Sequence, residues 1–374
     1  MKKIIAIISS LFLLPAANAQ DCNDAAIINV KGKWKMLANN IVNPEKTFPS
    51  SQYSLLYTRL DKIADMFREA YPQPTGIEAE WYRSIRGAAI VKNGPVPYQF
   101  NSLYLAWYCN QNLHKLMLGD ETGTWSYVFV NDLHWFLNDQ YDQLWMKINN
   151  VTAYFLPPTK EQWKGLAVYT PSGNQNCKVV LIMHNGQLPY KPVSRLLFLQ
   201  GLKEKLESDK KSQLDAMNKT PPKTDAEEEK IKQGQLAYIE KNYPVANQAK
   251  AKERYLKNYK SDKQRKEEDL QRSAKYFDDQ LMIIDNVWKN ESKEELQQPA
   301  IIEGPVNFKG FTNLEKGRML VTIDQSYFNM QLPKYVPQII MLYWQWHNNG
   351  PAQNFKKQLE ENFPVEKLKA MIDK

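Results

Sequence analysis

The chain has 374 residues, of which 49 are Lys or Arg, 41 are Asp or Glu, four are His and three are Cys. Hydrophobic residues make up 43% and charged residues 24%, values typical of a soluble globular protein, so a collagen, a low-complexity fibre and a disulfide-dense mini-protein are excluded. The length allows one large domain or two ordinary ones.

Residues 1–19 are predicted to form a secretory signal peptide. Lys2 and Lys3 make a positive start, residues 4–14 are apolar but too short to span a bilayer, and Ala17-Asn18-Ala19 resembles a cleavage site. An uncleaved anchor is the alternative. We therefore expect an exported bacterial protein, periplasmic or extracellular, with no transmembrane span in the mature chain. Cleavage leaves 49 − 2 = 47 basic and 41 acidic residues, a net charge of +6 that does not by itself imply nucleic acid.

Three cysteines in an oxidising compartment suggest one disulfide and one spare thiol. Cys109 and Cys177 both lie in strand-like segments, so we predict that they pair and that Cys22 is the spare; the other two pairings remain open. The sequence contains no CxxC motif, Cys/His cluster or HExxH motif. We therefore expect neither a metal site nor a cofactor.

The first half of the chain is predicted to form one amphipathic helix and then a series of strands. Apolar residues recur at helical spacing over 52–70. Alternating and aromatic-rich segments then predict strands at 76–86, 98–109, 125–130 and 144–155, and a hairpin that pairs 166–169 with 178–183. Ser194 is the predicted N-cap of a helix that begins near Arg195.

Residues 201–298 are predicted to form a charged helical insertion. Residues 203–295 contain 21 basic and 20 acidic side chains, and Thr220-Pro221-Pro222 divides them into two helical parts. The second part carries a seam spaced 4, 3, 4, 3 and 4 residues apart, which predicts an antiparallel hairpin or short coiled coil. Its members are Leu270, Ala274, Phe277, Leu281, Ile284 and Trp288. Eight basic residues within 250–266 indicate either a solvated helix face or contact with an anionic surface.

Residues 299–374 return to strand character, followed by two short helices. Strands are expected at 318–323 and 337–346, and the strongly apolar segment 332–346 favours a buried central strand over an exposed docking strand. The predicted fold class is α+β. An aromatic-rich, mainly antiparallel sheet body (20–200 and 299–374) with flanking helices is interrupted by the insertion. Three consecutive modules are the alternative.

Aromatic residues are concentrated between residues 98 and 169, which include 16 Phe, Trp and Tyr among 72 positions. Exposed aromatic faces stack on sugars, so one interpretation is a glycan-binding face; the other is a strand-rich aromatic core. The candidate ligand-facing residues are Trp107, Trp125, Trp135, Trp145, Trp163, Asp132 and His184.

No GxSxG elbow, P-loop, dinucleotide fingerprint or calcium loop is present. The leading hypothesis is therefore a non-catalytic binding or scaffolding protein, whose unidentified protein partner contacts the helical insertion; a glycan is a further candidate ligand, and nucleic acid is not expected. One alternative is a secreted hydrolase acting on glycan or another polymer, which requires at least two of these tryptophans exposed along one cleft. The other is a carrier of a small molecule or lipid.

Overall fold

The computed structural model describes residues 24–41, 48–86, 89–137, 146–148, 151–171, 176–304 and 308–374. The predicted signal peptide, residues 1–19, lies outside this part of the chain. The chain divides into two compact units. The sheet unit draws on Met1–Phe136, Thr159–Gln187 and Ser326–Lys374, and the helical unit on Leu137–Pro158 and Leu188–Gln325. The predicted insertion, 201–298, lies inside the helical unit. The domain boundaries expected from the sequence remain a prediction.

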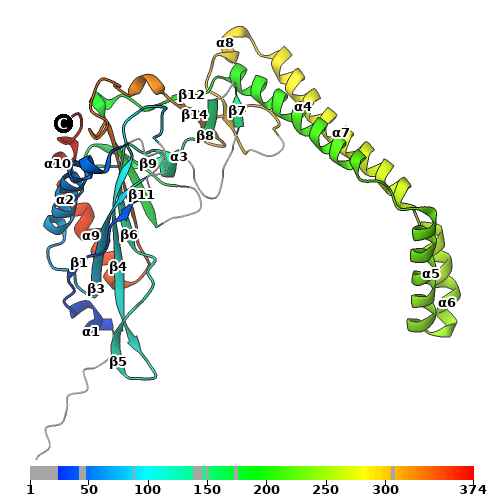
Figure 1. The fold of residues 1–374 in the computed structure, drawn as a ribbon, viewed down its shortest axis with the longest axis horizontal. Helices are drawn as coiled ribbons and strands as arrows, with labels where there is room; N and C mark the ends of the chain where they lie inside the picture. Colours follow the sequence, from blue (N-terminus) through cyan, green and yellow to red (C-terminus); the bar gives the residue numbers. More distant parts are fainter. Residues whose placement is uncertain are drawn as a thin grey trace, which may run out of the picture. The chain divides into compact units, whose positions relative to one another are not determined.

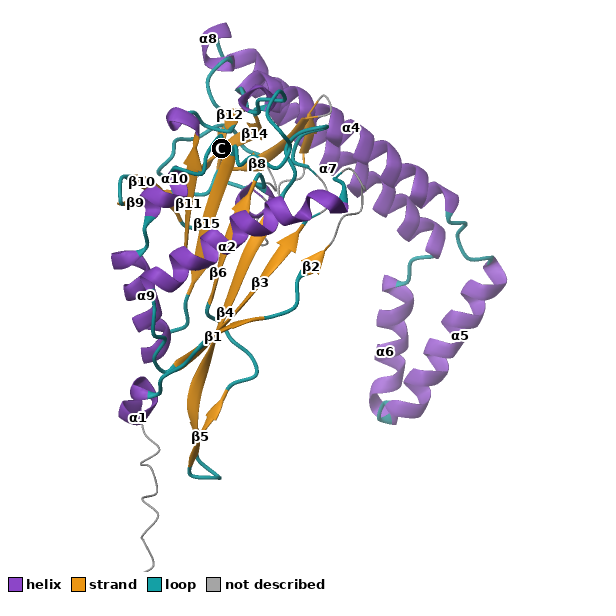
Figure 2. Ribbon diagram, turned by 60° about the vertical axis from the view of Figure 1, so that its left-hand side comes forward, coloured by secondary structure: helices purple, strands orange, loops and turns teal. Residues whose placement is uncertain are grey.

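The sheet unit is an α+β structure built on a ten-stranded, mostly antiparallel sheet (Figures 1 and 2). The main path runs β1-β3-β4-β6-β15-β11-β10-β9; β2 pairs with β3 and β5 pairs with β4. Only β1 and β2 run parallel to their neighbour, among the described pairings of this sheet. The strands are β1 (Trp34–Met36), β2 (Asn40–Ile41), β3 (Ile77–Ile85), β4 (Tyr98–Asn110), β5 (Lys115–Leu118), β6 (Trp125–Val130), β9 (Thr159–Trp163), β10 (Leu166–Tyr169), β11 (Cys177–Met183) and β15 (Ile339–Gln345). The helices are α1 (Asp24–Asn29), α2 (Tyr53–Ala70), α3 (His134–Leu137), α9 (Gly350–Asn362) and α10 (Val365–Lys369).

The strand β15 occupies the middle of this sheet, as its apolar sequence predicts. It pairs antiparallel with β6 on one side and β11 on the other, and its first six residues are buried. A strand buried on both faces has no need of polar alternation, which explains the continuous apolar run.

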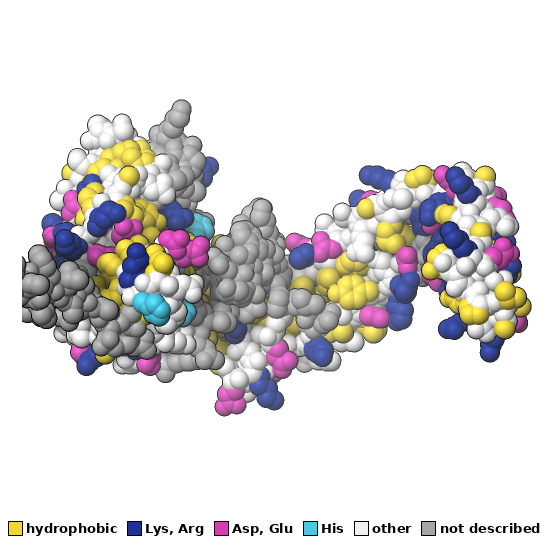
Figure 3. Space-filling view, turned by 90° about the horizontal axis from the view of Figure 1, so that it is seen from below, with side chains coloured by type: hydrophobic (Ala, Val, Ile, Leu, Met, Phe, Trp, Pro, Cys, Tyr) yellow, Lys and Arg dark blue, Asp and Glu magenta, His cyan; other side chains and the backbone are white. Residues whose placement is uncertain are grey.

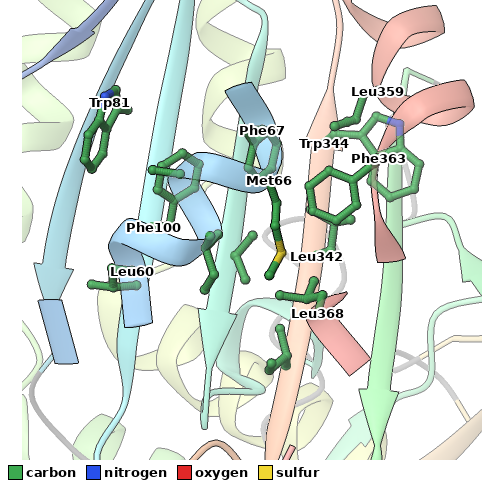
Figure 4. Packing of buried hydrophobic residues seen from close by; sticks show 14 of the residues in the cluster. Leu60, Met66, Phe67, Trp81, Phe100, Leu342, Trp344, Leu359, Phe363 and Leu368 are labelled. Carbon is green, nitrogen blue, oxygen red and sulfur yellow. The ribbon is translucent and has the colours of Figure 1, made fainter. Parts of the chain in front are cut away.

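The helices α2, α9 and α10 pack on one face of the sheet and cover it (Figure 4). Phe67 of α2 stacks on Phe100 of β4 with ring centroids 4.9 Å apart, and Phe363 meets the same Phe67 ring edge-on at 4.9 Å. Trp344 of β15 is fully buried in this cluster. The aromatic-rich strands therefore supply one wall of an ordinary apolar core.

The predicted disulfide between Cys109 and Cys177 is wrong. Cys109, near the end of β4, is disulfide-bonded, whereas Cys177 keeps its thiol and is buried at the start of β11. Because β6 and β15 lie between β4 and β11, the two strands are about 14 Å apart, well beyond the roughly 7 Å that a disulfide spans between Cα atoms. Cys22 lies outside the described residues.

The helical unit combines a five-stranded sheet with long helices. The sheet follows the order β12-β14-β8-β7, and β13 pairs with β14. The predicted single strand 144–155 is instead two antiparallel strands within its described part. The elements are β7 (Met146–Ile148), β8 (Val151–Phe155), β12 (Tyr190–Pro192), β13 (Ile301–Ile302), β14 (Arg318–Ile323), α4 (Arg195–Lys219), α5 (Asp225–Asn242), α6 (Val245–Asn258), α7 (Asp262–Asn290) and α8 (Lys293–Leu296).

The long helices α4 and α7 form an antiparallel pair, which confirms the predicted helical hairpin (Figure 1). Phe277 and Ile284 of the predicted seam are buried, and its other four members are half-buried. Ser194 caps α4 as predicted, since its side chain accepts a hydrogen bond from the Leu197 N–H at 3.2 Å. At the base of the pair, Ile284 joins Phe198 and Leu199 in a buried cluster with Phe155 of β8. The helix pair is thereby anchored to the small sheet.

A ladder of ion pairs fixes how α4 and α7 are aligned. The bases lie on α4 and the acids on α7 or directly after it: Arg195 with Glu291 at 3.0 Å, Lys203 with Asp285 at 2.8 Å, and Lys210 with Asp278 at 2.5 Å. At the far end, the Lys266 ammonium donates to the Thr220 carbonyl at 2.6 Å. The more exposed pairs of Lys203 and Lys210 each contribute little stability, but together with the more buried Arg195–Glu291 pair they favour the antiparallel register over a shifted one. No described helix of the chain is both long and apolar enough to cross a membrane.

Candidate functional site

Two of the predicted tryptophans, Trp125 and Trp135, belong to one aromatic cluster on the second face of the large sheet. Side chains alternate along β6, so Trp125, Tyr127 and Phe129 lie opposite the face that α2 covers. Tyr127 stacks on Tyr343 of β15 at 5.8 Å, and Trp135 of α3 packs on Phe129 at 5.9 Å. Burial raises the pKa of Tyr127 to about 12, helped by the neighbouring Tyr82. The ring of Trp135 is the exposed one, at 37%.

The other tryptophans are not brought to this cluster. Trp163 of β9 packs against Trp344 at 5.3 Å, and its indole N–H donates to the Glu360 carbonyl at 2.8 Å. Trp107 is half-buried opposite Leu118 of β5. Trp145 lies outside the described residues. Of the four predicted tryptophans that the structure describes, Trp125 and Trp135 are therefore brought together, whereas Trp107 and Trp163 lie elsewhere in the sheet unit.

Asp132 lies two residues before the first residue of the short helix α3. Its carboxylate is buried and accepts hydrogen bonds from the His134 N–H at 2.8 Å and from the His134 ring Nδ1 at 2.9 Å. The bond to Asp132 raises the pKa of His134, against a smaller opposing effect of burial. One carboxylate thus accepts from both the backbone and the ring of His134, a local side-chain contact between residues two positions apart.

His184 directly follows β11 and contacts Asp373, next to Lys374. Its ring Nδ1 is 2.6 Å from the Asp373 carboxylate, and its ring centroid is 4.7 Å from that of Tyr327. The Tyr327 hydroxyl accepts from the His184 N–H at 3.1 Å and donates to the Gln338 carbonyl at 2.7 Å. These contacts tie the C-terminal turn to the sheet, which gives the histidine a structural role.

The helices α5 and α6 form a second hairpin in the helical unit, and it has almost no core. Of the 18 residues of α5 only Glu228 and Ile239 are buried, and none of the 14 residues of α6 is. Most of the stability of a helix in a protein comes from packing of its apolar face against other elements. Large apolar side chains stay exposed instead, among them Val245 at 85% and Tyr238 at 54%.

Between α5 and α6 lies an open groove of about 760 Å³, which we call the α5–α6 groove. Its apolar lining comes from both helices and the turns that follow them: Ile231, Ile239, Tyr243, Ala251, Tyr255 and Tyr259. Its charged lining is entirely basic and consists of Lys250, Arg254, Lys260 and Arg265. Figure 3 shows hydrophobic side chains beside Lys and Arg, and also Asp and Glu, at the α5–α6 end of the helical unit.

Capping hydrogen bonds define the ends of the helices that form this groove. Thr224 and Glu227 make a capping box at the start of α5, and Ser261 with Gln264 makes another at the start of α7. The Glu228 carboxylate accepts from the Asp262 N–H at 2.5 Å and from the Tyr259 hydroxyl. The break between α6 and α7 distributes the predicted run of basic residues, 250–266, over two helices.

The sequence indicated the basic residues of this groove but not the groove itself. Interpreted as one continuous helix, residues 250–266 place their basic side chains over most of the helix circumference. The Ser261-x-x-Gln264 pattern was the signal that a new helix begins there. Within the described ranges, no group of three or more His, Cys, Asp or Glu side chains could hold a metal ion.

Comparison with known proteins gives no relative from which a site could be transferred. No protein-family model matches the chain, and neither the curated proteins nor the solved structures contain a match.

Proposed function

We propose that this chain is an exported, non-catalytic binding or scaffolding protein, and that its helical unit supplies the surface for a protein partner. The observation that carries the proposal is the contrast between the two helix pairs. The α4–α7 pair has a seam whose six residues are buried or half-buried and an ion-pair ladder of its own, whereas the α5–α6 pair leaves apolar side chains exposed around a groove. Exposed apolar surface rimmed by polar groups is typical of an interaction site. Export rests on the sequence of residues 1–19.

The test is to remove the α5–α6 hairpin without disturbing α4 and α7. The Lys223 N–H donates to the Asp262 carboxylate at 3.1 Å, so the two ends of the hairpin already lie side by side. Deleting 224–260 joins Lys223 to Ser261, keeps the α7 cap, and leaves Thr220–Lys223 as a connection of ordinary length for two antiparallel helices.

We expect the deleted chain to keep its thermal midpoint and far-ultraviolet spectrum apart from the lost helix. Chemical cross-linking in the envelope or secreted fraction of its own cells should give a discrete heavier adduct with the full chain and none with the deleted chain. The same adduct from both chains would refute the proposed role of this hairpin.

Neither alternative function is favoured by a specific observation. A glycan hydrolase requires two or more of the predicted tryptophans exposed along one cleft, and of the four described only Trp135 is exposed. Beside it, the Asp132 carboxylate already accepts from the backbone and the ring of His134.

A further inference from the structure

We infer that the α5–α6 groove binds an acidic amphipathic helix of another protein, a proposal that rests on the proposed function and specifies its partner. The first reason is that two helices make an incomplete bundle. Ile239 is the only apolar residue of the hairpin that is fully buried, while Ile231 and Tyr243 in the groove lining remain 43% and 46% exposed. A third helix laid along the groove would cover these side chains, as in helix-in-groove recognition.

The second reason is charge. None of the residues that line the groove is acidic, and all of them lie in the described part of the chain. Two of the cations already have partners outside the groove: Lys260 pairs with Glu268 at 2.6 Å and Arg265 with Asp262 at 3.6 Å. Lys250 and Arg254 are exposed on α6 and form no ion pair with any described residue. They are one helical turn apart, about 6 Å, which matches two carboxylates one turn apart on a partner helix.

The same charges argue against two other occupants. A second copy of this chain in a symmetric groove-to-groove contact would bring an identical basic groove against this one, and like charges facing each other across an interface are unfavourable. A polyanion without apolar groups would leave Ile231, Tyr243 and Tyr255 uncovered. Since α6 has 14 residues and is about 21 Å long, the bound helix should span about four turns.

The experiment is a selection with peptides displayed on phage, which can be carried out before the natural partner is identified. A library of random peptides of about 16 residues, long enough for four turns, is selected on the full chain. Binders to the chain that lacks 224–260 are removed. We expect the enriched sequences to carry net negative charge, with apolar residues 3 and 4 positions apart. Absence of enrichment, or enrichment of neutral or basic sequences, would overturn the inference.

A charge reversal then tests the contact directly. The double variant Lys250→Glu with Arg254→Glu should weaken the binding of a selected acidic peptide at least tenfold, and a copy of that peptide with Lys in place of its acids should bind the variant better than the original chain. The matched control is Lys230→Glu with Lys257→Glu, which changes the same net charge at exposed positions of α5 and α6 outside the groove lining. Equal weakening by both pairs would show a general charge effect and contradict the inference.

Heparin and vesicles containing anionic lipid serve as competing probes. If either binds the full chain and displaces the selected peptide while the apolar variant Ile231→Ser binds the peptide unchanged, the groove is a polyanion site and the inference fails. Failure of this inference can be distinguished from failure of the proposed function. Loss of the cross-linked adduct on deletion of 224–260, without acidic selection, would leave the binding role and reject only this partner class.

Discussion

The α4–α7 pair should depend on one buried side chain, Ile284, more than on any of its exposed ion pairs. Ile284 is 1% exposed and packs in the cluster that holds the helix pair to the small sheet, together with Phe198, Leu199 and Phe155. Replacing it with Ala removes three carbon atoms from this cluster. At about 0.8 kcal/mol for each buried methylene-sized group, the transfer loss is about 2.4 kcal/mol.

Two further contributions adjust that figure. The cavity left behind places Ile→Ala substitutions in the range of about 2–5 kcal/mol, and the better helix propensity of Ala returns about 0.4 kcal/mol. We therefore expect a net loss near 3 kcal/mol, which corresponds to roughly a hundredfold increase in the open population of this pair.

Hydrogen–deuterium exchange of individual backbone amides measures the open population of the α4–α7 pair residue by residue. The backbone amides of α4 near Phe198 and of α7 near Ile284 should exchange about a hundredfold faster in Ile284→Ala, under conditions where closing is faster than exchange. The matched control is Met282→Ala on the same helix, where the side chain is 58% exposed. Its effect should stay within about 0.5 kcal/mol, or roughly twofold. Similar exchange in the two variants would refute the argument that the buried cluster stabilises the helix pair.

Three other predictions concern the sheet unit. Because the hydrogen bond to Asp132 raises the pKa of His134, nuclear magnetic resonance should show a His134 pKa above the ordinary value of about 6.5, and Asp132→Asn should lower that pKa. The stability that this bond adds is present below about pH 6.5 and is lost as the pH rises through the pKa of His134 in the folded chain. Equal His134 pKa values in the original chain and the variant would contradict this prediction. Burial alone raises the pKa of Glu360, but hydrogen bonds from Lys356 and Lys178 outweigh this effect, so the pKa is lowered. In urea unfolding, Glu360→Gln should therefore lower the free energy of unfolding by roughly 1–3 kcal/mol at pH 7, and by progressively less as the pH falls through the pKa of Glu360 in the folded chain. A difference in free energy of unfolding between the two proteins that does not change with pH would refute this prediction. The thiol of Cys177 is buried, with 1% of the residue exposed, so it should be alkylated only in guanidinium. Peptide mapping should find Cys109 unmodified both with and without denaturant, because it is disulfide-bonded. Alkylation of Cys109 in the absence of reductant would contradict its disulfide.

Much of the fold could be predicted because local patterns and tertiary structure agree. The helix over 52–70, the strand 125–130, the seam from Leu270 to Trp288 and the buried strand near the C-terminus all carry a periodicity that the structure keeps. The pairing of cysteines failed because it depends on which strands are neighbours, and β6 and β15 separate Cys109 from Cys177. No local pattern encodes strand order.

The candidate site was harder to predict for the same reason. Tryptophan at strand positions such as Trp163 is equally suited to a core and to an exposed face, and only the packing of α9 and β15 against it decides. The groove depends on a helix end at Asn258 and on apolar residues of α5 that lie next to α6 only in three dimensions. Recognising the capping box at Ser261 would have located that helix end.

The position of β15 has a consequence for the order in which the chain can fold during synthesis. This strand joins β6 to β11, yet it comes more than 150 residues after β11 in the sequence. Until residue 345 has been made, the edges of β6 and β11 therefore lack the partner that the finished sheet provides. At roughly 5–20 residues per second, the delay between β11 and β15 is about 8–30 s, during which those edges can pair with other chains. The sheet is thus completed only when its C-terminal segment is available, whereas the α4–α7 pair is complete about 50 residues earlier.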